Sequence, residues 1–177
     1  GKILAAQYAR STGIPYLGIC LGMQVATVEF ARNVCHLDGA HTTECDKDTP
    51  HPVISLQEEQ KGIKDMGATM RLGSCDSIVH SGTLAANLYG GEQTIKERHR
   101  HRYEFNPAYL EQLKEAGLII SSISAEEGLV EIIGLADHPF YIGAQFHPEF
   151  QSKPNRPHPL FSGFVKASLE STAAGSD

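Results

Sequence analysis

The sequence of 177 residues has no run of 18 or more apolar residues, so it predicts no transmembrane helix. It also has no excess of positive charge: the formal net charge of −6 disfavours a general affinity for nucleic acid or for acidic membranes. It contains neither a Cys-x-x-Cys pair nor a Gly-x-x-x-x-Gly-Lys-Ser/Thr loop for nucleotide phosphates. The scattered cysteines favour reduced thiols in a cytoplasmic enzyme over a disulfide framework or a zinc site. They are Cys20, Cys35, Cys45 and Cys75.

Short apolar runs alternate with segments of helical periodicity along the chain. This alternation predicts an α/β fold with a mostly parallel central sheet flanked by helices. A turn is expected at Gly73 and Ser74, and the last two strands are expected to form a C-terminal hairpin. The expected strands are residues 16–19, 53–56, 69–72, 76–80, 118–123, 129–135 and 140–146. The expected helices are residues 2–10, 23–32, 81–88, 108–116 and 160–171.

The length and a hydrophobic content of 41% suit a single domain. We place this domain at residues 1–171 and expect a loose tail at residues 172–177. Residues 57–67 are expected to form a surface loop. Because the chain opens directly into a helix and does not begin with methionine, we expect it to be a piece of a longer protein.

Cys20 lies at a corner between an apolar run and a helical segment, with Gly18 and Gly22 on either side. This is the cysteine version of the nucleophile elbow Gly-x-Ser-x-Gly. Such a sharp turn strains the backbone of the central residue, and side chains at both glycine positions would clash with neighbouring elements. The helix N-terminus would favour the thiolate, and the N–H of Leu21 could bind a developing oxyanion. The competing interpretation is a buried structural cysteine. We take Cys20 as the candidate nucleophile.

A base and an orienting acid for this cysteine are offered by His147-Pro148-Glu149, which follows an apolar strand. Residues two apart in extended backbone project to the same side, so His147 and Glu149 can lie together. The histidine can accept and return a proton near neutral pH, and the glutamate can hold the other ring nitrogen. The competing interpretation is a turn with a solvated acid. Together with the elbow, the motif predicts a catalytic triad of Cys20, His147 and Glu149.

These two motifs together resemble the class I, or triad, glutamine amidotransferases, whose domain carries them near its two ends. The resemblance implies a flavodoxin-like fold. It also implies hydrolysis of the side-chain amide of L-glutamine through a cysteinyl thioester, with no cofactor or metal in this domain. It places Gln24 against the substrate, gives Glu44 the substrate's α-ammonium group, and gives Arg102 and the backbone of Tyr103 its α-carboxylate. One anion and one bidentate cation are a sensible pair for a zwitterionic amino acid. An exposed loop glutamate and an arginine in an ordinary surface ion pair are the competing interpretations.

The tract from Glu97 to Asn106, Glu-Arg-His-Arg-His-Arg-Tyr-Glu-Phe-Asn, is unusual in composition. Read alone, it fits a solvated basic strand, a nucleic-acid patch or a metal-binding histidine pair. Nucleic acid is disfavoured by the acidic chain, and a metal by the arginines between the histidines. Within the family, the tract is similar to that of glutaminase domains fused to a nucleotide synthetase.

That resemblance implies a synthetase domain on the same polypeptide, which uses the ammonia together with ATP and Mg²⁺, and a homo-oligomer, a tetramer, as the full-length enzyme. The N-terminal strands and the glycine-rich loop that gives family members a second oxyanion donor are expected to lie outside this chain. The alternatives are another triad amidotransferase, such as one for GMP or anthranilate synthesis, a γ-glutamyl hydrolase, or a non-catalytic regulatory domain of the same fold.

Overall fold

The computed structural model describes residues 1–56 and 70–174, so the surface loop expected at residues 57–67 lies outside the described residues. Its centre is a six-stranded sheet with the order β1-β9-β8-β7-β4-β5. The strands of this sheet are β1 (Tyr16–Ile19), β4 (Arg71–Val79), β5 (Thr94–His101), β7 (Leu118–Ser124), β8 (Val130–Leu135) and β9 (Tyr141–Ala144). A second sheet has the order β2-β3-β6, with β2 (His41–Thr42), β3 (Pro52–Ser55) and β6 (Glu104–Phe105).

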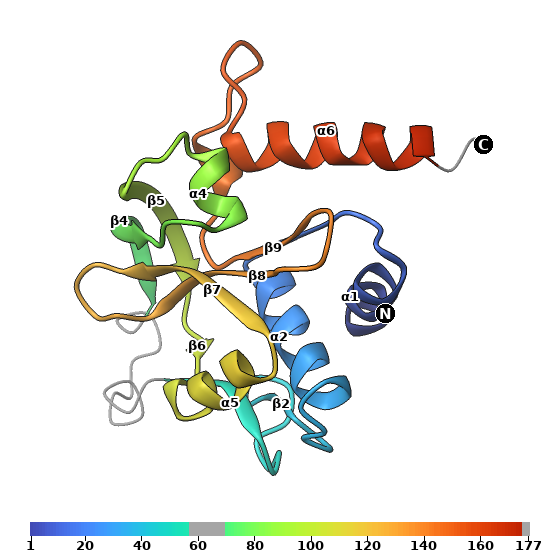
Figure 1. Ribbon diagram of the computed structural model, residues 1–177. Coiled ribbons are helices and arrows are strands. Elements are labelled where there is room, and N and C mark those ends of the chain that lie inside the picture. The colour runs from blue at the N-terminus through green and yellow to red at the C-terminus, as the bar shows by residue number, and fades with distance from the viewer. Residues whose placement is uncertain (57–69, 175–177) are drawn as a thin grey trace.

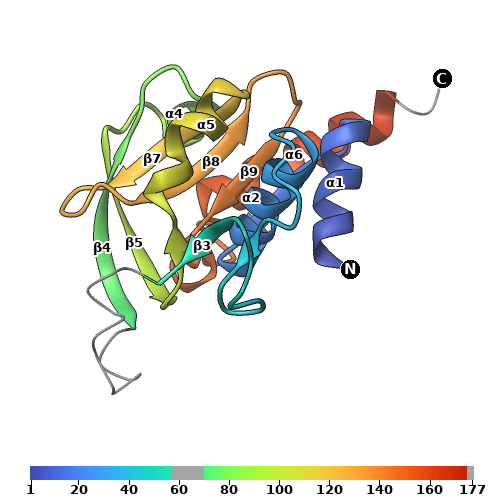
Figure 2. The same cartoon turned by 90° about the horizontal axis from the view of Figure 1, so that it is seen from below.

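Helices cover both faces of the central sheet (Figure 1). On one face lie α1 (Lys2–Thr12), α2 (Leu21–Asn33) and α5 (Leu110–Glu115), together with the small sheet. Figure 2 shows α1 alongside α2 on this face. On the other face lie α4 (Leu84–Leu88) and α6 (Pro159–Ala174). Each face has its own apolar core, so the expected α/β arrangement with flanking helices is confirmed. No helix of the described chain is long and apolar enough to cross a membrane.

The expected parallel pairing is wrong for most of the central sheet. Only β1 and β9 pair in parallel, whereas the neighbouring pairs from β9 to β5 are antiparallel. Short loops join β7 to β8 and β8 to β9, and a parallel connection would need a crossover of a dozen or more residues. The last two strands therefore form the hairpin that the sequence predicts.

The turn expected at Gly73 and Ser74 is also absent, because both residues lie inside the continuous strand β4. The strand pairs with β5 from Arg71 to Ile78, and this ladder carries the chain straight through the glycine. Two other boundaries shift slightly. The helix expected at residues 108–116 becomes the 3₁₀ turn η1 (Pro107–Tyr109) followed by α5, and α6 continues to Ala174, into the expected tail.

The helix α2, which begins next to the elbow, is fixed on both sides. Glu29 is fully buried and accepts three hydrogen bonds from the Arg10 guanidinium of α1, with a nearest N···O distance of 2.8 Å. On the sheet side, a Cβ placed on Gly143 would lie 2.8 Å from Ile133 and 3.1 Å from the backbone of Met23. Glycine at position 143 therefore allows α2 to approach β9 closely.

Candidate active site

Cys20 connects the end of β1 to the start of α2 and has φ 50° and ψ −104°. A positive φ is strained for a residue with a side chain, and surrounding hydrogen bonds hold it in place. The Cys20 N–H donates to the carbonyl of Ala144 on the neighbouring strand at 2.7 Å, and the Cys20 carbonyl accepts from Gln24 N–H at 3.2 Å. The strand–cysteine–helix elbow is therefore present with the strained geometry predicted from the sequence.

The two glycines of the elbow are not equivalent. A Cβ on Gly18 would lie 2.7 Å from the carbonyl carbon of Gly22 and 2.8 Å from the ring of Tyr16. A Cβ on Gly22 would meet nothing closer than the Tyr16 hydroxyl, at 3.9 Å. The predicted clash therefore applies to Gly18 and is wrong for Gly22. The Tyr16 hydroxyl also donates to the Gly22 carbonyl at 2.8 Å, which ties the strand to the helix start.

The Cys20 sulfur is half-buried, and burial raises the pKa of the thiol. The N–H of Leu21 at the helix start lowers the pKa of Cys20, but the negative charges of Glu104, Glu149 and Glu44 raise it further. The helix start therefore favours the thiolate as expected, but desolvation outweighs it and the net shift of the Cys20 pKa is upward. The pKa of Cys20 therefore lies above its usual range, and forming a thiolate here calls for a base. The four cysteines are all free.

His147 and Glu149 lie together, as the sequence predicts. His147 Nδ1 is 2.7 Å from Glu149 Oε1, and the 3₁₀ turn η2 (Pro148–Phe150) fixes the step between them. The backbone N–H of His147 donates to the Arg98 carbonyl on β5 at 2.8 Å. Because β1 and β9 are parallel neighbours, the segments that carry Cys20 and His147 leave the sheet at the same edge. The other ring nitrogen, His147 Nε2, is buried and has no partner among the described residues.

The predicted substrate residues come from several elements. Glu44 is exposed in the turn after β2, and its charge reaches Cys20. Arg102 and Tyr103 join β5 to β6 and are half-buried. Gln24 is buried in α2, and its Nε2 donates to the Tyr103 carbonyl at 3.1 Å and to Gln145 Oε1 at 3.2 Å. A contact from Gln24 to a substrate would therefore have to use its amide oxygen.

Of the predicted substrate residues, Tyr103 lines a hollow of about 280 Å³, whereas Glu44, Arg102 and Gln24 are not part of its lining. Thr43, which precedes Glu44, and Tyr103, which follows Arg102, both line it, as do Pro52 and Asn106. The small sheet therefore gathers the two predicted substrate-binding segments around one depression.

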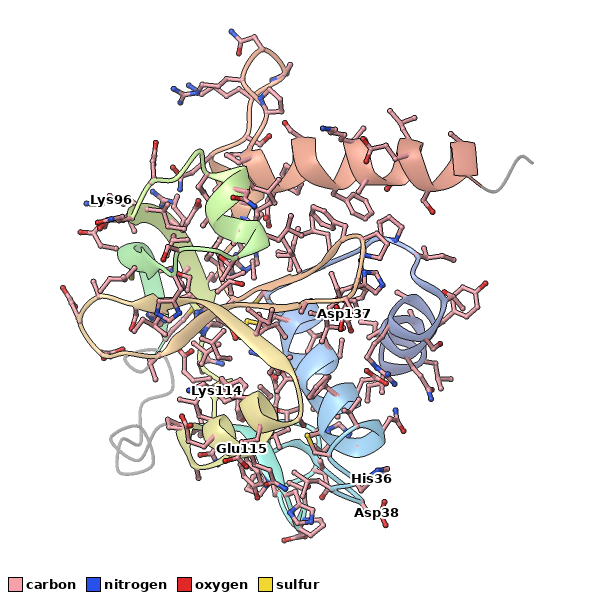
Figure 3. The ribbon with its side chains drawn as sticks, in the orientation of Figure 1. His36, Asp38, Lys96, Lys114, Glu115 and Asp137 are labelled. Atoms are coloured by element: carbon pink, nitrogen blue, oxygen red, sulfur yellow. The ribbon has the colours of Figure 1, made fainter. Side chains whose placement is uncertain are left out.

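The basic tract begins in β5, in which burial alternates along the strand, and continues through a loop into β6. The histidines His99 and His101 point inward, whereas Lys96, Arg98 and Arg100 are exposed. Figure 3 shows Lys96 pointing outward from this strand. The expectation of a solvated basic strand therefore fits the arginine-bearing face only. In the described part of the chain, no group of three or more His, Cys, Asp or Glu side chains could hold a metal ion.

The inward histidines belong to a buried polar cluster beneath the site. His99 Nδ1 is 3.0 Å from His101 Nε2, and His101 Nδ1 is 3.2 Å from both the Tyr103 carbonyl and Glu104. Since the carbonyl can only accept, His101 donates from Nδ1. Burial lowers the pKa of His99 to about 3, so the ring of His99 is neutral near pH 7.

Two further members of this cluster, one basic and one acidic, come from two strands that β7 separates. Arg71 on β4 pairs with the fully buried Glu131 on β8, and burial nonetheless raises the pKa of Glu131 to about 7. The sequence did not indicate this cluster, because its members come from strands that only the sheet order brings together. The same holds for Gln145, whose side chain contacts Cys20.

The fold and this site define a class of protein. The family model described as glutamine amidotransferase class-I matches residues 1–167, and the chain belongs to this family. It is 60% identical over 169 residues to a CTP synthase of Rubrobacter xylanophilus, which covers 96% of this chain and 30% of the relative. It is 57% identical over 175 residues to a CTP synthase of Moorella thermoacetica, which covers 99% of this chain and 32% of the relative.

Comparison with solved structures gives the same family and fold. The glutaminase domain of Trypanosoma brucei CTP synthase with bound acivicin superposes with a TM-score of 0.89 at 39% identity, over 96% of this chain and 65% of that one. A putative GMP synthase subunit of Thermoplasma acidophilum shares the fold with a TM-score of 0.60 at 18% identity, over 98% of this chain and 66% of that one. The chain spans about 30% of the length of the curated relatives it matches.

Proposed function

We propose that this chain is the glutaminase domain of a CTP synthase, which hydrolyses L-glutamine to glutamate and ammonia. The observation that carries the proposal is the strained Cys20 elbow at the same sheet edge as the paired His147 and Glu149, with Glu149 in electrostatic reach of Cys20, in a chain that is 60% identical to a CTP synthase. A non-catalytic domain of the same fold would have no reason to keep a strained nucleophile beside an oriented base.

In the proposed reaction, His147 Nε2 takes the proton from the Cys20 thiol as the sulfur attacks the carboxamide carbon of glutamine. The N–H of Leu21 holds the developing oxyanion, and Glu149 stabilises the imidazolium through Nδ1. The tetrahedral intermediate collapses when the imidazolium returns its proton to the leaving nitrogen, which departs as ammonia. His147 then activates a water that cleaves the glutamyl thioester, which releases glutamate and restores the thiol.

The ends of the substrate would be held by the small sheet and its neighbours. The Glu44 carboxylate accepts the α-ammonium group, and Arg102 with the N–H of Tyr103 binds the α-carboxylate. This assignment is supported by the position of Glu44 within electrostatic reach of Cys20. The hollow between Thr43 and Tyr103 lies between the two segments.

The remaining activity belongs to the part of the relatives that this chain does not span. We place the glutaminase domain at residues 1–171. The ammonia would be used by a synthetase domain of the same polypeptide to convert UTP to CTP with ATP and Mg²⁺. The glutaminase domain itself would need no cofactor. The full-length enzyme would act in the cytoplasm as a tetramer.

The test compares two sources of ammonia in the full-length protein. With glutamine as donor, Cys20→Ala should abolish both ammonia release and CTP formation but leave glutamine binding intact. With ammonium chloride as donor, the same variant should still form CTP. The matched control is Cys45→Ala, an exposed cysteine whose loss should change neither rate. Glutamine-dependent ammonia release by Cys20→Ala would overturn the proposed nucleophile, and a product other than CTP would overturn the proposed enzyme.

A further inference from the structure

Gln145 follows β9 directly, and its side chain is fully buried beneath the elbow. Its Nε2 donates to the Cys20 sulfur across 3.6 Å, a distance typical of a hydrogen bond to sulfur. Its backbone N–H donates to the Glu131 carbonyl at 2.9 Å, so the residue is held by main chain as well. Burying an unpaired amide at this position would be costly. The Gln145 amide therefore depends on its hydrogen bonds, one of which is to the proposed reacting atom.

The backbone carbonyl of Tyr103 fixes the orientation of the Gln145 amide, and it does so through the side chain of Gln24. The Tyr103 carbonyl can only accept, so the Gln24 side chain must turn its Nε2 toward it. The same Nε2 faces Gln145 at 3.2 Å, so Gln145 must present its oxygen to Gln24. The amide group of Gln145 then presents its nitrogen to Cys20. The chain from Tyr103 through the two glutamines therefore fixes a donor against the sulfur.

The charge around the sulfur makes this donor useful. Burial disfavours a negative charge on Cys20, and the carboxylates of Glu104, Glu149 and Glu44 act in the same direction. The favourable groups on the protein side are the N–H of Leu21 and the amide of Gln145, with His147 as the base. A thiolate formed here needs hydrogen-bond donors that are already in place when the proton leaves.

We propose that Gln145 is a further catalytic residue: its side-chain N–H donates to the Cys20 sulfur and stabilises the thiolate during attack, and Gln24 acts as a positioning residue that orients it. The inference rests on the proposed function, since it assigns a role within that reaction. It also couples the two halves of the site, because the Tyr103 carbonyl that orients the glutamines belongs to the segment proposed to bind the substrate carboxylate.

The experiment measures Cys20 alone. In the full-length protein, the rate of alkylation by iodoacetamide is followed against pH by mass spectrometry of the peptide that carries Cys20. Gln145→Met keeps the volume of the side chain and removes the donor. The alkylation profile should move to higher pH by about one unit, so that alkylation at pH 7 becomes about tenfold slower. Turnover should fall by a similar factor in kcat, with little change in the KM for glutamine.

Two further variants keep the result interpretable. Gln145→Glu preserves the oxygen that accepts from Gln24 and replaces the donor by a carboxylate, so it should move the profile further in the same direction. Gln112→Glu makes the same chemical change on the exposed face of α5 and should leave the profile in place. A purely structural role would lower the melting temperature of the Gln145 variants while their alkylation profiles stayed on that of the wild type.

The proposal is overturned if neither Gln145 variant moves the alkylation profile. This outcome is distinct from a failure of the proposed function. A wild-type protein that releases no ammonia from glutamine would overturn the glutaminase assignment, yet Cys20 alkylation would still report whether Gln145 stabilises the thiolate.

Discussion

His147 uses its two ring nitrogens differently: Nδ1 lies 2.7 Å from Glu149 Oε1, whereas Nε2 is buried and has no partner in the described residues. The carboxylate fixes the tautomer that carries its proton on Nδ1, so that Nε2 offers its lone pair to an incoming proton. When the ring becomes charged, the same carboxylate stabilises it. The pair is therefore prepared for one proton transfer at one nitrogen.

Glu149→Gln tests this relationship. The amide keeps the shape of the side chain but removes the charge that stabilises the imidazolium. We expect kcat for glutamine hydrolysis to fall by about 100-fold with little change in KM. The measurement is ammonia release under saturating glutamine. Glu170→Gln on the exposed surface of α6 is the control and should leave kcat unchanged. An unaltered kcat in Glu149→Gln would remove the acid from the proposed triad.

The geometry of the elbow gives a second prediction, in which the same substitution at two glycines has different effects on stability. Gly18→Ala places a methyl group 2.7 Å from the carbonyl carbon of Gly22, and backbone atoms cannot move aside cheaply. We expect a loss of about 2–3 kcal/mol of stability, measured as a lower midpoint in urea unfolding. Gly22→Ala lies in the first turn of α2 with 3.9 Å of clearance, so its stability should be equal to or slightly above that of the wild type. Equal losses in both variants would contradict the geometry of the elbow.

The parts of the site that could be predicted from the sequence are those encoded by local patterns. The elbow and the His-Pro-Glu turn are each encoded within a few consecutive residues, and glycine or proline at fixed positions indicates the backbone conformation. The helices were predicted for the same reason, because periodicity and caps are local. Asn106, for example, caps the turn at Pro107 by accepting from the Ala108 N–H.

The parts of the fold and of the site that the sequence did not predict depend on which strands become neighbours in the sheet. The alternation of strands and helices suggested a parallel sheet, but the chain from β7 to β9 carries no helix and folds back on itself. Arg71, Glu131 and Gln145 therefore showed no signal in the sequence, since their partners lie on other elements that are distant in the sequence. The pKa direction of Cys20 was mispredicted because the helix N-terminus is a local feature and burial is not.

The buried His99 makes stability depend on pH. The unfolded chain takes up a proton at this residue near pH 6.5, whereas burial lowers the folded-state pKa to about 3. Between these values the unfolded state binds more protons, so stability falls as pH falls. From pH 7 to pH 5, His99 should account for a loss of about 2 kcal/mol.

The measurement is urea unfolding at pH 7 and pH 5. His99→Asn should lose about 2 kcal/mol less than the wild type between these two values, whatever its stability at pH 7. The matched control is His36→Asn. His36 is exposed on the loop after α2, as Figure 3 shows, and asparagine tolerates its positive φ of 55°. This control should follow the wild-type slope. A wild-type slope in His99→Asn would show that His99 is charged in the folded state.

The ion pair between α1 and α2 gives the last prediction. Glu29 is fully buried, and Arg10→Met would remove its charged partner while keeping the aliphatic stem that packs on α2. Asn33 still donates to Glu29 at 2.9 Å, but one neutral donor does not replace a guanidinium. We expect a loss of about 3 kcal/mol, since an uncompensated buried charge is strongly destabilising. Thermal unfolding should show a melting temperature lower by about 6–12 °C.

Two comparisons decide whether the buried charge is the cause. Lys166→Met removes one partner of an exposed pair on α6, in which the side chains of Lys166 and Glu170 are 77% and 67% exposed, and it should leave the melting temperature unchanged. The double variant Arg10→Met with Glu29→Met removes both charges and should recover part of the loss, because two apolar side chains can replace a buried ion pair. If the double variant were less stable than Arg10→Met alone, packing of the Arg10 and Glu29 side chains would be the main contribution, and the charge of Glu29 a minor one.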